Sequence, residues 1–295
     1  MITDTIIQNK VASVIKLSII TPVFNAAGFI NNFIKTLKEQ KFQEWEIIFL
    51  ENCSIDNTAD LIRSFSSNDS RIILITEKDK GIYDAMNKGI GLAKGEWLYF
   101  MGSDDFFYDE MVLSKISKYL NPSSDIVYGD SLWVPEMIEE VGEWSHTNIL
   151  YQSINHQRIF YKRNLFSNEI KYNINYKVAA DHALNIRLFC DKNIVKNYFP
   201  ILIAKYYSGG YSRNKIDESF WDDWDLTFYN HFKGILPKKI IFSSLGIYCR
   251  YLIDKKKYNK FFRILIKIFL NTFSIGVSLL ILKYMVKNMF TYEKS

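Results

Sequence analysis

Two adjacent carboxylates, Asp104 and Asp105, directly follow a largely apolar segment at residues 96–101. A short apolar run of this kind predicts a buried strand, which places both carboxylates just beyond a strand end. Hard divalent cations prefer oxygen ligands, and such a cation can carry the charge of a diphosphate. The spacing therefore predicts a site for a metal-bound diphosphate at the end of this strand.

Three more polar clusters occupy comparable places, at residues 21–25, 51–56 and 79–84. Each of them follows an expected strand or opens an expected helix. Parallel strands present their carboxyl ends at one edge of a sheet, and ligands of open α/β sheets bind outside that edge. With residues 103–105 as the fourth cluster, the pattern predicts one binding rim built from four strand ends.

Strands and helices are expected to alternate through the first half of the chain. The expected strands are residues 17–20, 46–50, 71–76 and 96–101, and the expected helices are residues 31–40, 56–65 and 83–92. Pro22 is expected to end the first strand, and Asp56 suits a helix N-cap. This order predicts an α/β fold with a mostly parallel central sheet flanked by helices.

The second half of the chain is less regular. A helix near residues 109–120 and a strand at 125–128 are expected to precede an aromatic-rich hairpin over 131–144. Three further elements are expected, a strand at 158–160, a helix at 181–190 and a strand at 197–207. The regular alternation therefore ends near residue 128.

Seven short segments resemble, in order and spacing, the motifs of the family 2 glycosyltransferases, which have the GT-A fold. They are TPVFN (21–25), ENCSIDNT (51–58), DKGIYDAMNKGI (79–90), GEWLYFMGSDD (95–105), HQRIFYK (156–162), ADHALNIRL (180–188) and YYSGGYS (206–212). Each motif alone is weak, but the ordered set is highly specific. It is most similar to the branch that builds bacterial O-antigen, capsule and exopolysaccharide chains.

The resemblance implies a GT-A catalytic domain over residues 1–215, with a donor-binding half at about 15–130 and an acceptor half at about 131–215. A basic, apolar, helical C-terminal extension would follow at residues 216–295.

The resemblance also implies donor-binding roles at the rim. The loop after the first strand holds the nucleotide in this family, and the matching residues are Thr21, Pro22, Val23 and Asn25. An acid after the second strand recognises uracil, and Glu51 takes that place, since a carboxylate can accept from the ring N–H. The uridine and ribose side is matched by Asp79, Gly81 and Asp84. The alternative role of Asp84 is to stabilise the first turn of its helix.

The family binds its metal through Asp-x-Asp followed by another acid, and Gly102 replaces the first of these aspartates here. Asp104 remains as the expected ligand of Mg²⁺ or Mn²⁺, with the donor diphosphate and water in the other positions. Ser103 belongs to the same donor-binding motif. Asp105 either supports the metal ligand or contacts the sugar on the acceptor side, and the alternative for Asp104 is an ordinary cap.

Inverting sugar transfer needs a base within hydrogen-bond reach of the attacking hydroxyl. The family supplies this base from a Glu-Asp pair that opens a helix, with an arginine six residues later. Asp181 matches the aspartate and Arg187 the arginine, whereas Ala180 replaces the glutamate. Asp181 is therefore the expected catalytic base, and its alternative role is that of a helix N-cap.

Further residues are matched on the acceptor side and near the diphosphate. His156 and Gln157 resemble a pair that lines the acceptor side, although a lone histidine is more often structural. Gly209-Gly210 is expected to let a loop close over the diphosphate. Lys205 and Arg213 are candidates to neutralise its charge.

Charge is divided unevenly along the chain. The net charge is +5, yet 13 basic residues from Lys233 onward accompany only two acids, so the preceding part is acidic overall. This pattern argues against nucleic-acid binding and favours peripheral contact with an anionic membrane surface, with a merely solvated basic face as the alternative. Lys267 and Asn271 interrupt the apolar run at 264–282, which favours an interfacial helix over a span. A helix packed on the catalytic body is the other alternative.

Three widely spaced cysteines form no metal-binding pattern, and the N-terminus lacks the apolar core of a secretory signal. We therefore expect a peripheral enzyme at the cytoplasmic face of the inner membrane. The resemblance implies an inverting, metal-dependent transferase that moves a hexose or N-acetylhexosamine from a UDP-sugar to a lipid-linked glycan of a cell-surface polysaccharide. A non-catalytic nucleotide- or glycan-binding scaffold is the alternative, because Gly102 and Ala180 replace family acids. A nucleotidyltransferase is disfavoured, since TPVFNAAGF lacks a basic, glycine-rich signature.

Overall fold

The structure is a computed structural model that describes residues 15–166, 169–207, 216–223 and 228–272, with the single residues 279 and 283. Within these residues, one sheet has the strand order β3-β2-β1-β4-β8-β6-β9-β5, and β7 pairs with β6. The strands are β1 (Leu17–Val23), β2 (Trp45–Glu51), β3 (Ile72–Thr76), β4 (Trp97–Phe100), β5 (Phe106–Phe107), β6 (Ile126–Val134), β7 (Ile138–Glu140), β8 (Ile159–Lys162) and β9 (Lys196–Tyr207).

The strands β3, β2, β1 and β4 are parallel and form the half of the sheet that the sequence predicts. All residues of β2 and β4 are buried, as expected for strands that are covered on both faces. β1 ends at Val23, one residue beyond Pro22, in agreement with the prediction that the strand stops at about Pro22. Because β4 pairs with β1 only as far as Ile20, Pro22 lies where β2 is the sole neighbour, and its missing amide hydrogen is tolerated there.

The other half of the sheet is mixed. β8 runs antiparallel to both β4 and β6, so β6 points in the same direction as β4. β9 is parallel to β6, and β5 is antiparallel to β9. β6 and β7 form the predicted hairpin, with Ser131 opposite Glu140. The carboxyl end of β6 therefore lies at the same edge of the sheet as the ends of β1 to β4.

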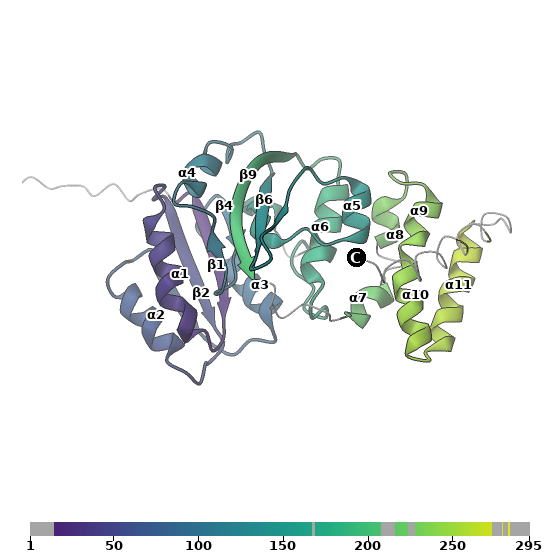
Figure 1. Ribbon diagram of the computed structural model, residues 1–295, viewed down its shortest axis with the longest axis horizontal. Coiled ribbons are helices and arrows are strands. Elements are labelled where there is room, and N and C mark those ends of the chain that lie inside the picture. The colour runs from purple at the N-terminus through teal and green to yellow at the C-terminus, as the bar shows by residue number, and fades with distance from the viewer. Residues whose placement is uncertain are drawn as a thin grey trace, which may run out of the picture.

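Helices cover both faces of the sheet (Figure 1). One face packs against α1 (Ala27–Glu39), α2 (Thr58–Ser66) and α4 (Val112–Ser117). The opposite face packs against α3 (Ile82–Leu92), α5 (His146–Tyr151) and α6 (Ala180–Cys190). α1 buries Ile30, Phe33, Ile34 and Leu37, whose spacing gives the helix one apolar stripe. Asn57 rather than Asp56 is the N-cap residue of α2, one position later than predicted.

The C-terminal extension forms a group of helices beyond α5 and α6 (Figure 1). They are α7 (Glu218–Asp223), α8 (Tyr229–Phe232), α9 (Lys238–Ser243), α10 (Leu245–Asp254) and α11 (Tyr258–Thr272). Phe232, Leu252 and Ile264 are buried in the same apolar cluster as α6. No helix in the described ranges is long and apolar enough to cross a membrane. The buried residues show that one side of the extension packs on the catalytic body, which was one of the alternatives considered.

Candidate active site

The loops that follow β1 and β2 are tied together by reciprocal hydrogen bonds. The Asn25 amide N–H donates to Ser54 Oγ (2.9 Å), and Asn25 Oδ1 accepts from the Ile55 amide (3.0 Å). The Ala26 amide donates to Thr58 Oγ1 (2.8 Å). Asn25 has a φ of 50°, which asparagine tolerates better than most residues. The side-chain oxygen of Asn25 is thus used to shape the rim.

Glu51 ends β2, and its side chain is buried beneath these loops, with the residue only 1% exposed. Its Oε1 accepts a hydrogen bond from the Ser54 amide, whereas Oε2 is buried and has no hydrogen-bond partner among the described residues. Thr21 Oγ1, on the neighbouring strand β1, is buried and unpartnered in the same sense. An unsatisfied buried polar group costs about 1–3 kcal/mol, so Glu51 Oε2 fits a hydrogen-bond donor from a ligand.

The turn before α3 is built by its own aspartates. Asp79 Oδ1 accepts from the Gly81 amide (2.8 Å), and Asp84 Oδ2 accepts from the Lys80 amide (3.0 Å). Gly81 has a φ of 126°, a conformation that side chains disfavour. Asn52 Oδ1 accepts from the Asp79 amide (3.0 Å) and joins this turn to the end of β2. Asp79, Gly81 and Asp84 therefore set the shape of the rim through local hydrogen bonds.

The two carboxylates after β4 converge on the space in front of Gly102. A Cβ atom added to Gly102 would lie 2.7 Å from Asp105 Oδ2 and 3.0 Å from Asp104 Oδ1. Asp105 Oδ2 accepts hydrogen bonds from the Gly102 amide (3.0 Å) and from Gln157 Nε2 (2.7 Å). Burial and the neighbouring charge of Asp104 raise the pKa of Asp105 to about 6, against the opposing effect of Gln157. Because Gly102 has no Cβ, the carboxylates of Asp104 and Asp105 can both lie close to its backbone.

These two carboxylates are a partial set of ligands for a cation. Among the described residues, no group of three or more metal-ligating side chains occurs. Asp105 Oδ2 already has two protein donors, whereas Asp104 is half-buried beside it. A hard cation needs six or more oxygen ligands, so one here would take the others from a ligand or water. The residues fit a divalent cation that arrives with a diphosphate and is held by Asp104.

Asp181 lies in the first turn of α6, and Ala179 is the N-cap residue of that helix. The Tyr83 hydroxyl donates to Asp181 Oδ1 (3.1 Å), and His156 Nδ1 is 3.7 Å from Asp181 Oδ2. Burial alone would raise the pKa of Asp181, but the nearby His156 and the His182 amide outweigh it and lower that pKa. An ionised carboxylate at this position can accept a proton.

Asp105, His156 and Gln157, three of the four residues predicted for the acceptor side, are brought together at η1 (His156–Arg158). Gln157 contacts Asp105 and His156 contacts Asp181, so adjacent residues hold carboxylates from the two halves of the chain. Arg187 is not part of this cluster. Its Nη1 donates to the Glu169 carbonyl (2.6 Å), and six residues place it about 120° around α6 from Asp181.

Two residues at the site were not identified from the sequence. Asn52 and Tyr83 lie inside quoted motifs, but only the fold reveals that Asn52 joins two loops and that Tyr83 contacts Asp181. Of the residues considered for the diphosphate, Lys205 has Nζ 4.9 Å from the centre of the Tyr108 ring. Gly209-Gly210 and Arg213 lie outside the described residues.

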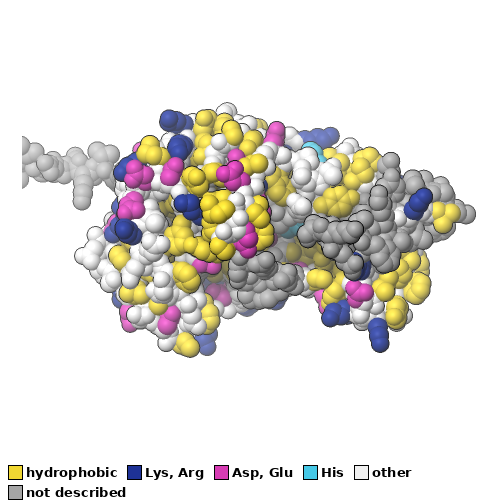
Figure 2. Space-filling view, in the orientation of Figure 1, with side chains coloured by type: hydrophobic (Ala, Val, Ile, Leu, Met, Phe, Trp, Pro, Cys, Tyr) yellow, Lys and Arg dark blue, Asp and Glu magenta, His cyan; other side chains and the backbone are white. Residues whose placement is uncertain are grey.

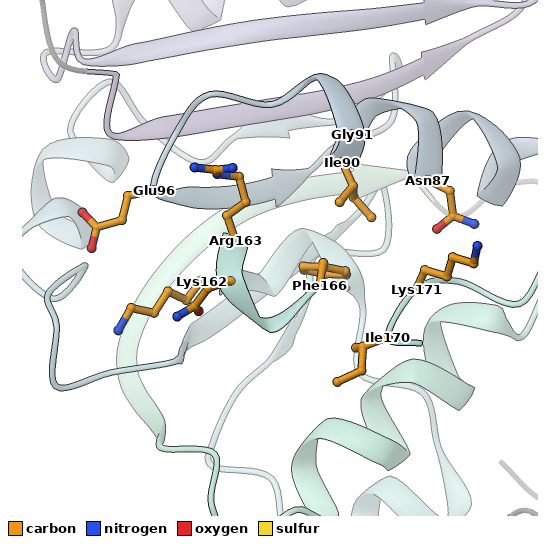
Figure 3. Close-up of a pocket in the computed structure, with 10 residues that line it drawn as sticks. Asn87, Ile90, Gly91, Glu96, Lys162, Arg163, Phe166, Ile170 and Lys171 are labelled. Atoms are coloured by element: carbon orange, nitrogen blue, oxygen red, sulfur yellow. The ribbon is translucent and has the colours of Figure 1, made fainter. Parts of the chain in front are cut away.

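A cavity of about 610 Å³ opens at the opposite edge of the sheet (Figure 3). Figure 3 shows Ile90 and Gly91 from the end of α3 facing Arg163 and Phe166 from η2 (Arg163–Leu165) and the residue after it. Its lining residue Glu96 directly precedes β4, so the cavity lies at the amino ends of the parallel strands. None of the predicted site residues lines this cavity. The rim, rather than the cavity, is the candidate active site.

Known proteins resemble this chain in sequence and in fold. The model of glycosyl transferase family 2 matches residues 18–184. A PGL/p-HBAD biosynthesis glycosyltransferase of Mycobacterium tuberculosis is 34% identical over 208 residues, which cover 69% of this chain and 81% of the relative.

Two solved structures show the same fold at low sequence identity. S. aureus TarS 1-349 in complex with UDP-GlcNAc superposes with a TM-score of 0.68 at 16% identity, covering 93% of this chain and 88% of that one. The mannosyltransferase PcManGT from Pyrobaculum calidifontis, in complex with GDP-Man and Mn²⁺, has a TM-score of 0.54 at 16% identity, covering 94% and 81%. The predicted GT-A fold is thus confirmed, and the chain belongs to glycosyl transferase family 2.

Proposed function

We propose that this glycosyltransferase is an inverting enzyme that transfers a hexose or N-acetylhexosamine from a UDP-sugar to a hydroxyl of a lipid-linked glycan. One observation carries the proposal. His156 contacts Asp181 and the adjacent Gln157 donates to Asp105, which links the proposed base to the acids at the donor rim. Direct displacement needs the base at the attacking hydroxyl and the diphosphate on the opposite face of the anomeric carbon.

The uracil assignment is supported by Glu51. Its buried Oε2 lacks a donor among the described residues, and the N3–H of uracil is a donor. The solved complex of TarS with UDP-GlcNAc supports a UDP-sugar in a protein of the same fold. The donor-binding roles of Thr21, Pro22, Val23, Asn25, Asp79, Gly81, Asp84 and Ser103 are part of this proposal.

In the proposed reaction, Asp181 accepts the proton of the acceptor hydroxyl while its oxygen attacks C1 of the sugar. The new C1–O bond forms on the face opposite to the departing UDP, whose bond to C1 breaks, so the configuration inverts. A divalent cation held by Asp104, when bound, offsets the charge that develops on the departing diphosphate. His156 and Tyr83 keep the Asp181 carboxylate in place through their contacts.

The acceptor proposal is supported by the relative that is named for PGL/p-HBAD biosynthesis and by α11. Tyr258, Phe262 and Ile266 recur every four residues along α11 and are exposed by 49%, 58% and 59%. Arg263, in the same helix, is exposed. Figure 2 shows apolar and basic side chains side by side at the right-hand end of the molecule. Such a stripe fits the interface of an anionic bilayer at the cytoplasmic face.

The donor is tested with a panel of UDP-, GDP- and dTDP-sugars, purified full-length protein and Mn²⁺ or Mg²⁺, with a polyprenyl-diphosphate-linked sugar as acceptor. We expect release of UDP from one UDP-sugar, and we expect EDTA to remove it. Release of GDP or dTDP alone would overturn the UDP assignment. Activity that is unchanged by EDTA would overturn the metal assignment.

The same panel decides the alternative, a scaffold that binds nucleotides or glycans without turnover. That alternative is favoured by Gly102 and Ala180, because each of them replaces an acid that the family has at its position. It predicts UDP binding by calorimetry with no release from any donor across a range of lipid-linked acceptors. Turnover with any of them would exclude the scaffold.

A further inference from the structure

Helix α7, the first helix of the C-terminal extension, lies between the segment that leads into α6 and the helices α10 and α11 (Figure 1). Asp217, directly before α7, is only 7% exposed. Its Oδ2 accepts hydrogen bonds from the amides of Val178 (2.9 Å) and Ala179 (3.2 Å), and its Oδ1 accepts from the Phe220 amide (3.3 Å). One buried carboxylate thus joins the start of α7 to the two residues that precede α6.

Phe220 of α7 makes a second contact beside the proposed base. Its ring stacks on the ring of His182, with the centroids 5.2 Å apart. The His182 amide donates to Asp181 Oδ1 (2.8 Å), and His182 Nε2 lies 2.7 Å from the Ile149 carbonyl oxygen. The contacts from α7 therefore reach residues on both sides of Asp181.

The other side of α7 is held by α10 and the start of α11. Glu218 forms an ion pair with Lys257, and Asp222 forms one with Lys260, at the start of α11. The Tyr248 hydroxyl of α10 also donates to Asp222 Oδ1 (2.8 Å). α7 has only six residues, too few to form a stable helix alone, so its position depends on these contacts.

We propose that Asp217 is a positioning residue for Asp181 and that α11, through α7, fixes Asp217. The inference rests on the proposed function, because it takes Asp181 as the base. A misplacement of a reacting group by about 1 Å can lower a rate on the order of a hundredfold. Loss of the contacts that Lys257 and Lys260 make with α7 is therefore expected to slow transfer.

The first test replaces Asp217 in the full-length protein. Asp217→Ala is expected to lower kcat about tenfold, with the KM for the donor and the affinity for UDP within about twofold of wild type. Asp254→Asn is the matched control, since Asp254 is an exposed acid of the same extension whose ion pair, with Arg250, stays within α10. A kcat within about twofold of wild type, or a parallel loss of UDP affinity, would overturn the positioning role.

The second test addresses the link to α11. Glu218→Lys reverses one charge of the pair with Lys257, and the double variant Glu218→Lys/Lys257→Glu restores opposite charges. We expect the single variant to lower kcat and the double variant to recover at least half of the loss. Equal losses in both would exclude transmission through this pair.

Hydrogen exchange separates this inference from the proposed function. In Asp217→Ala and Glu218→Lys, the amides of residues 178–183 are expected to exchange faster, while those of β1 and β2 are unchanged. Unchanged exchange at 178–183 would overturn the inference whatever the kinetics. Suppose that Asp181→Asn transfers sugar at the wild-type rate, while Asp217→Ala and Glu218→Lys show faster exchange at residues 178–183. Then the assignment of Asp181 as the base is wrong, but the structural link between α11 and α6 stands.

Discussion

The hydroxyl of Tyr83 donates a hydrogen bond to Asp181 Oδ1 at 3.1 Å, across 98 residues of sequence. Tyr83 lies in the first turn of α3, which follows the turn at residues 79–81 on the donor side. Asp181 lies in the first turn of α6 in the acceptor half. The contact therefore joins the two parts of the proposed active site. It also gives the base a partner that comes from the donor side.

We predict that Tyr83→Phe lowers kcat about three- to tenfold, because one hydrogen bond to a charged group contributes about 1 kcal/mol or more. The ring, which stacks on Tyr172, is kept, so the KM for the donor is expected to stay unchanged. Tyr172→Phe is the matched control. The hydroxyl of Tyr172 is buried without a hydrogen-bond partner in the described part of the chain, so its removal should leave the rate unchanged. Equal rates for both variants would contradict the role of Tyr83.

We predict that Glu51→Gln weakens UDP binding about tenfold, since a carboxylate oxygen that faces the uracil N3–H is replaced in part by an amide donor. Cytosine carries an acceptor at N3, so the preference for UDP over CDP should narrow. Calorimetry with both nucleotides measures this ratio. A ratio that stays as in wild type would show that Glu51 does not read the base.

Much of the rim follows from the sequence, because buried parallel strands are short apolar runs and their polar ends must share one edge. The strands β1 to β4 and the clusters after them were predicted in this way. The antiparallel direction of β8 was not predicted, since the residue pattern of a four-residue strand is the same for parallel and antiparallel pairing. The contacts of Asp181 with Tyr83 and of Asp217 with Val178 were also not predicted, because no local periodicity reports pairs this far apart.

We predict that Asp105→Asn stabilises the protein in EDTA at neutral pH by on the order of 2 kcal/mol. Burial raises the folded pKa of Asp105 to about 6, above the unfolded value, so ionisation at higher pH costs stability. The gain should be largest above pH 6 and should vanish only below about pH 3, where the carboxyl is protonated in the folded and the unfolded state. Thermal unfolding across this range measures it. A gain that is the same at pH 4 and pH 7 would contradict a raised pKa.

We predict that Phe262→Ser/Ile266→Ser weakens binding to phosphatidylglycerol vesicles roughly tenfold, because two exposed apolar side chains of α11 are removed. Phe29→Ser is the control, since Phe29 is an exposed aromatic of α1 on the catalytic body. Vesicle sedimentation measures the affinity, and added salt should weaken it further. Loss of binding in the Phe29 variant alone would place the membrane contact elsewhere.

The most direct test of the account is the rate of sugar transfer by Asp181→Asn under single-turnover conditions, with UDP affinity measured on the same protein. We predict a loss of about a thousandfold in transfer, since general base catalysis contributes a factor of this order. UDP affinity and the unfolding temperature should remain close to wild type. Transfer within about tenfold of the wild-type rate would contradict the assignment of Asp181 as the base.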